Sequence, residues 1–64
     1  MIHTEHNGLR FVIEEDNLDV GAYLYVFDKG KCVHDTLQND IATCKEVAHD
    51  DYGVPREQWI ESPT

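Results

Sequence analysis

The chain has 64 residues, 41% of them hydrophobic, and a net charge of -8, so it has room for one small domain (1–64) with a thin core. Thirteen Asp and Glu stand against five Lys and Arg, and affinity for phosphates depends mainly on cationic contacts. We therefore expect neither a nucleic-acid nor a membrane partner.

The first residues are polar and carry neither a basic start nor an apolar run. We expect residues 1–7 to fray, and we expect the chain to lack a secretory signal. The protein should then be cytoplasmic, with Cys32 and Cys44 as free thiols.

From Leu9 to Glu15, apolar residues alternate with others, which predicts a first strand with one buried face. The acidic residues 14–19 should form a solvated connection to the next element.

Aromatic and branched residues from Ala22 to Phe27 predict a second strand, and Gly30 in the following polar segment suits a tight turn. Lys31 to Thr36 then forms a third, more polar strand. We expect the second and third strands to pair as a hairpin.

An amphipathic helix is predicted next, because its apolar residues recur at helical spacing; they are Ile41, Cys44, Val47, Ala48 and Tyr52. Asn39 or Asp40 can cap its start, and Gly53 suits its left-handed C-terminal cap.

Pro55 then begins a short helical tail that folds Trp59 onto the core, and residues 61–64 should fray. The predicted fold is α+β: a three-stranded antiparallel sheet in the order β-β-β-α, with one helix packed on it and a helical tail.

The second strand is apolar on both faces, since Tyr23, Tyr25 and Phe27 alternate with smaller apolar residues. One helix covers only one face of such a sheet. The Trp59 tail, a second subunit or a ligand can cover the other. We take the interaction surface to be Tyr23, Tyr25, Phe27 and Trp59.

Cys32, His34 and Cys44 are the candidates for a metal site, because they supply three ligands that suit zinc. The paired Cys or His spacings typical of structural zinc are missing, so we assign no metal and no cofactor. A cysteine nucleophile could use His34 as its base, since alternate strand residues share a face, but nothing in so short a chain indicates a concave pocket. The sequence also shows no glycine-rich phosphate loop. We therefore predict that the chain is not an enzyme.

Residues 22–38 (AYLYVFDKGKCVHDTLQ), residues 48–55 (AHDDYGVP) and Trp59 resemble small bacterial proteins of unknown function. These proteins have a hairpin, an acidic helix that ends in aromatic-Gly-Val, and a closing tryptophan. The resemblance implies a compact, bacterial, cytoplasmic domain and no catalytic residues.

The function that we expect is a non-enzymatic protein-interaction module, homodimeric through its sheet or bound to another protein. One alternative is an acidic inhibitor or immunity-type protein that binds a basic partner, since the helix and the 14–19 segment are rich in carboxylates. A metal- or ligand-binding domain is the other alternative. A metal site on Cys32, His34 and Cys44 predicts that chelation lowers stability.

Overall fold

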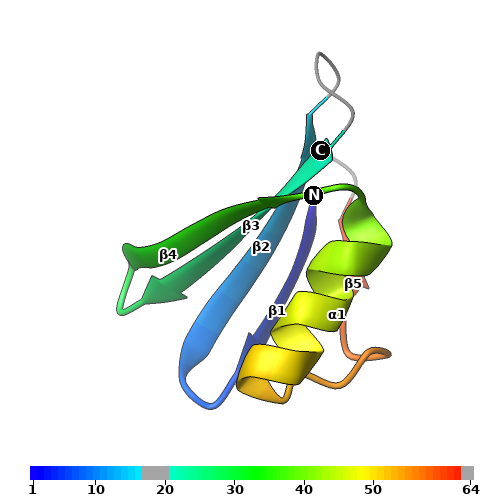
Figure 1. Cartoon of the computed structure of the whole chain (residues 1–64). Helices are drawn as coiled ribbons and strands as arrows, with labels where there is room; N and C mark the ends of the chain where they lie inside the picture. The colour runs from blue at the N-terminus through cyan, green and yellow to red at the C-terminus, as the bar shows by residue number, and fades with distance from the viewer. Residues whose placement is uncertain (17–20, 63–64) are drawn as a thin grey trace.

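A computed structural model describes residues 1–16 and 21–62 as a five-stranded antiparallel sheet with one helix on one of its faces (Figure 1). The elements are, in chain order, β1 (Ile2–His6), β2 (Leu9–Asp16), β3 (Gly21–Asp28), β4 (Lys31–Gln38), α1 (Ile41–Tyr52) and β5 (Ile60–Glu61). The strands lie in the order β4-β3-β2-β1-β5. The fold is thus α+β, but the expected three-stranded sheet is wrong by two strands.

The first missed strand is β1, which was expected to fray. It pairs with β2 from Ile2 opposite Ile13 to His6 opposite Leu9. Asn7 and Gly8 join the two strands with positive φ angles of 52° and 80°. Positive φ angles at both positions are typical of a two-residue hairpin turn whose twist matches that of the strands. Asn-Gly is the preferred sequence for this turn.

The second missed strand is β5, so the expected helical tail is also wrong. Gln58 N donates to Pro55 O at 3.2 Å, which closes a single turn, and the chain then extends beside β1. The backbones of Met1 and Ser62 exchange hydrogen bonds of 2.8 and 3.0 Å. The outer edge of β1 supplies hydrogen-bond partners for the backbone of this segment. A four-residue helical segment would satisfy few of its own backbone N–H and C=O groups. Of the residues expected to fray at this end, 63–64 lie outside the described part of the chain.

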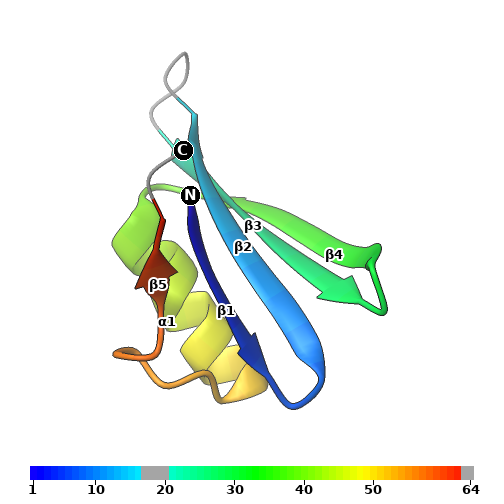
Figure 2. The same ribbon diagram turned by 180° about the vertical axis from the view of Figure 1, so that it is seen from behind.

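The expected hairpin is confirmed, because β3 and β4 pair along their lengths. Lys29 and Gly30 form its turn with φ angles of 52° and 80°. This turn lies far from the helix in both views (Figures 1 and 2). Residues 14–16, which were expected in the acidic connection, belong to β2, and residues 17–20 lie outside the described residues.

The predicted helix is confirmed, and so are its caps. Asp40 Oδ1 accepts hydrogen bonds from Thr43 N at 2.8 Å and from Thr43 Oγ1 at 2.7 Å. Gly53, with a φ of 74°, donates its N–H to His49 O. The cap satisfies carbonyl groups that the last helical turn leaves free, and Val54 is fully buried beside it.

The core lies between α1 and the face of the sheet that carries alternate residues of β2 and β3. Its fully or almost fully buried side chains are Phe11, Ile13, Ala22, Leu24, Val26, Cys44, Ala48 and Val54. Ile41, Val47, Tyr52 and Trp59 pack around them. The helix therefore covers the face with the smaller residues of β3 and leaves the aromatic face without it.

Candidate interaction surface

The face of the sheet opposite α1 carries a patch that we call the open face, defined as Arg10, Val12, Glu14, Tyr23, Tyr25 and Phe27. Side chains alternate between the two faces of a strand, and residues opposite one another on paired strands share a face. The register places Arg10 opposite Phe27, Val12 opposite Tyr25, and Glu14 opposite Tyr23. The patch is thus three cross-strand pairs in a row.

The aromatic rings of the open face form a continuous stripe along β3. Tyr23 and Tyr25 stack with ring centroids 5.9 Å apart and planes at 19°, and Tyr25 and Phe27 follow at 6.4 Å and 39°. All three rings are partly exposed, whereas Val12 between them and β1 is only 8% exposed. Burial and the nearby carboxylate of Glu14 raise the pKa of Tyr25, so its hydroxyl stays protonated at neutral pH.

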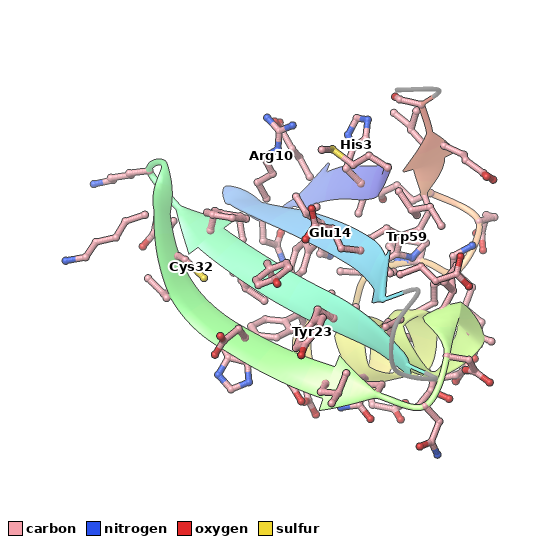
Figure 3. All side chains as sticks on the ribbon, turned by 90° about the horizontal axis from the view of Figure 1, so that it is seen from above. His3, Arg10, Glu14, Tyr23, Cys32 and Trp59 are labelled. Carbon is pink, nitrogen blue, oxygen red and sulfur yellow. The ribbon has the colours of Figure 1, made fainter. Side chains whose placement is uncertain are left out.

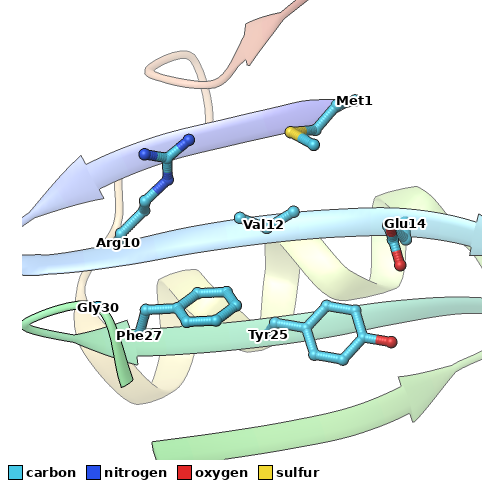
Figure 4. Close-up of a pocket in the computed structure, with 7 residues that line it drawn as sticks. All are labelled: Met1, Arg10, Val12, Glu14, Tyr25, Phe27 and Gly30. Atoms are coloured by element: carbon cyan, nitrogen blue, oxygen red, sulfur yellow. The ribbon is translucent and has the colours of Figure 1, made fainter. Parts of the chain in front are cut away.

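A shallow hollow of about 480 Å³ crosses this face (Figure 4). Its lining combines most of the open face with Met1 and Gly30. Figure 4 shows Val12 and Tyr25 at the centre, Arg10 and Phe27 toward one end, and Glu14 toward the other, with the helix behind the sheet. The hollow has an apolar floor and opposite charges at its two ends.

Trp59, which was grouped with the three β3 aromatics, does not belong to their stripe, and Figure 3 shows it away from Tyr23. Its ring meets that of Phe11 edge to face, with centroids 6.3 Å apart, and it packs against the core. Phe11 points to the helix side of β2. Trp59 therefore helps to close the core, as its position in the tail predicts, and does not cover the open face.

The three candidate metal ligands do not converge. Cys32 lies opposite Phe27 and His34 opposite Val26, because a bulge shifts the register between them. Neighbouring β3 residues point to opposite faces, so the bulge separates Cys32 from His34, which simple alternation would place together. Cys44 is buried under the helix, where its thiol donates to Ala22 O at 3.4 Å. Within the described ranges 1–16 and 21–62, no three His, Cys, Asp or Glu side chains gather as a metal site would require.

The acidic surface proposed for a basic partner is partly neutralised at the helix. Glu46 accepts two hydrogen bonds from Arg56, at 2.6 and 2.9 Å. These bonds hold the pKa of Glu46 below its ordinary value. Asp50 and Asp51 remain exposed on the same helix, while Glu14 belongs to the open face instead.

Three residues of the open face were missed at the sequence level: Arg10, Val12 and Glu14. They fall on the polar side of the alternating pattern in β2, which is expected to face solvent. The available signal was Val12, an apolar residue in the middle of that side. Val12 lies opposite Tyr25 of the aromatic strand, so it extends the apolar area from β3 to β2.

The chain shows no significant match to known protein families, to curated proteins or to solved structures. Within the part of the chain that the structure describes, no helix is long and apolar enough to cross a membrane. The open face is consequently the feature of the molecule from which a function can be inferred.

Proposed function

We propose that this protein is a non-enzymatic interaction module that binds a protein partner through the open face. The observation that carries the proposal is the aromatic stripe Tyr23–Tyr25–Phe27, which the protein's own helix leaves uncovered. Antiparallel sheets with one covered face usually carry polar residues on the other. Aromatic side chains are also the residues most enriched in the central part of protein interfaces.

The shape of the face favours a protein over a small molecule. Small-ligand sites are concave and bury most of the ligand surface. The hollow on the open face is shallow, and its floor of Val12, Tyr25 and Phe27 continues into the exposed side chains around it. A broad, flat partner would contact more of this surface than a small ligand could.

The module is proposed to act in the cytoplasm. Support comes from the cysteines, since Cys32 is an exposed free thiol and Cys44 a buried one. Exposed free thiols are typical of reducing compartments. Fractionation of the host cell tests this placement, and recovery in an extracytoplasmic fraction would contradict it.

The test of the function compares wild type with Tyr25→Asp after purification from the host without chelator. Native mass spectrometry should show a complex heavier than the 7.4 kDa chain for wild type. The complex should be lost in Tyr25→Asp, because the substitution places a charge in the middle of the apolar stripe. The substituted side chain lies outside the core, so circular dichroism should still report a folded chain.

Ala42→Asp is the matched control, since it adds the same charge at an exposed position on α1. It should retain the complex. A folded Tyr25→Asp variant with an unchanged complex, or a wild-type chain that is always bare and single, would contradict the proposed function. Added mass from a metal that is lost on chelation would support the metal-binding alternative instead.

A further inference from the structure

We propose that the partner on the open face is a second copy of this chain, stacked face to face about a two-fold axis through the Val12–Tyr25 pair. This inference rests on the proposed function of the open face and names its occupant. The two-fold axis lies in the interface and runs perpendicular to the strands. Facing strands then run in opposite directions, with β2 over β2 and β3 over β3.

The register of β2 and β3 provides the symmetry that such a dimer needs. A two-fold interface uses the same patch on both subunits, so the patch must complement itself. The pair Val12–Tyr25 is at its centre, with Arg10–Phe27 two residues away on one side and Glu14–Tyr23 two residues away on the other. The axis exchanges the two outer pairs between the copies.

Charge complementarity follows from this exchange. Arg10 of each copy is placed across from Glu14 of the other, which gives two opposite-charge contacts related by the axis. Both side chains are exposed, and among the described residues neither takes part in an ion pair within its own chain. Phe27 of each copy is placed across from Tyr23 of the other, so aromatic rings meet at both ends of the apolar centre.

The size of the face is adequate for a dimer. β2, β3 and β4 each have eight residues, so the face is about 27 Å long at about 3.4 Å per residue. Four strands about 4.8 Å apart make it about 19 Å wide. The flat footprint is about 500 Å² on each copy, so a dimer buries about 1,000 Å² in total before the projecting side chains add to it, which is the lower end for a specific interface.

Two carboxylates oppose the arrangement: Glu5 on β1 lies opposite Arg10, next to the position that Glu14 of the second copy takes, and Asp35 lies on β4. Asp35 on β4 lies opposite Tyr25, at the level of the axis. It therefore approaches Asp35 of the second copy at the rim of the interface. Asp35 is exposed on an edge strand, where water screens the repulsion. Asp35→Asn removes the part of this repulsion that screening leaves, so it should modestly strengthen the dimer, which is a signature of this axis.

Charge reversal tests the axis directly, with sedimentation velocity as the readout. Arg10→Glu alone and Glu14→Arg alone should each raise the dimer dissociation constant by about tenfold or more, because each places like charges across both contacts. The double variant should restore association. An equimolar mixture of the two single variants should also form mixed dimers, since one carries two negative and the other two positive charges at these positions.

The outcomes separate this inference from the function on which it rests. A purified wild-type chain that stays monomeric at high concentration, while the protein from its host carries another protein on the open face, overturns the second copy and leaves the interaction module intact. A dimer that Tyr25→Asp abolishes but that neither single charge reversal weakens overturns the axis. Failure of the double variant and of the mixture to associate, with circular dichroism showing folded chains, also overturns it.

Discussion

Arg10 and Glu14 project from the same face of β2, on either side of Val12, and each lies opposite an aromatic ring of β3. The two ends of the open face thus carry opposite charges although the whole chain has a net charge of -8. At long range two copies repel each other, whereas at contact the patch complements itself. The two effects respond differently to salt.

Self-association should therefore strengthen as salt is raised from about 0.01 M to about 0.1 M. Over this range the Debye length falls from about 30 Å to about 10 Å, which screens the repulsion between the net charges more than it screens a close contact. Dilution experiments at the two salt concentrations measure the change. An acidic inhibitor of a basic partner would show the opposite trend, because salt would weaken its attraction to that partner.

Leu24→Ala should unfold the protein at room temperature. Leu24 is fully buried at the centre of the core, and such truncations cost about 2–5 kcal/mol. A single core in so short a chain supplies no more than about 3–5 kcal/mol.

Leu37→Ala is the matched control, because Leu37 is 53% exposed on β4. At a dilution where the chain is monomeric, this change should alter the free energy of unfolding by no more than about 0.5 kcal/mol. Thermal unfolding followed by circular dichroism checks both variants. A folded Leu24→Ala with wild-type stability would show that the assigned core is wrong.

The two cysteines should differ in reactivity. Cys32 is exposed, whereas Cys44 is fully buried and donates to Ala22 O. Burial, with a smaller contribution from Asp40, raises the pKa of Cys44 to about 11, so its thiol stays protonated at mildly alkaline pH. Since the thiolate is the reactive form, a thiol reagent should modify one site in the native protein and two in denaturant. Equal rates at both sites in the native protein would contradict the burial of Cys44.

The helix cap should make stability depend on pH through Asp40. Its hydrogen bonds with the Thr43 side chain and backbone hold the pKa of Asp40 below its ordinary value of 3.8. The stabilisation is therefore present above that value and is lost as pH falls through the lower pKa of the folded state. Asp40→Asn keeps a capping side chain that does not titrate, so its midpoint of thermal unfolding should fall less than that of wild type on acidification.

Asp40→Ala removes the cap and should lower the midpoint already at neutral pH. The three proteins compared over an acid titration isolate the contribution of the Asp40 carboxylate from that of the other acidic residues. Identical pH profiles for wild type and Asp40→Asn would show that the cap does not depend on charge.

Much of the fold was predictable because local patterns decide it. The alternation in β2, the aromatic run in β3 and the spacing of Ile41, Cys44 and Ala48 all match the elements that form. The Asp40 and Gly53 caps also follow from their side-chain chemistry.

The two missed strands differ in what could have shown them. β1 has a local signal, the Asn7-Gly8 turn, which predicts a hairpin when extended segments flank it. β5 has only two residues, and it is stabilised by pairing with β1, which lies far away in the sequence. No local pattern identifies so short a strand.

The candidate site was predictable only in part for the same reason. Its aromatic half lies on one strand and is visible as Tyr23, Tyr25 and Phe27, but its charged half depends on the register between β2 and β3. The separation of Cys32 from His34 depends on a bulge that alternation does not predict. Both features come from pairing between strands.

The most direct test of the central claim is sedimentation equilibrium of the purified wild-type chain over a wide concentration range. The open face as a self-complementary surface predicts a mass that rises with concentration to twice 7.4 kDa, and a mass of 7.4 kDa throughout for folded Tyr25→Asp. A wild-type mass of 7.4 kDa at every concentration would contradict it, and so would a dimer that Tyr25→Asp leaves unchanged.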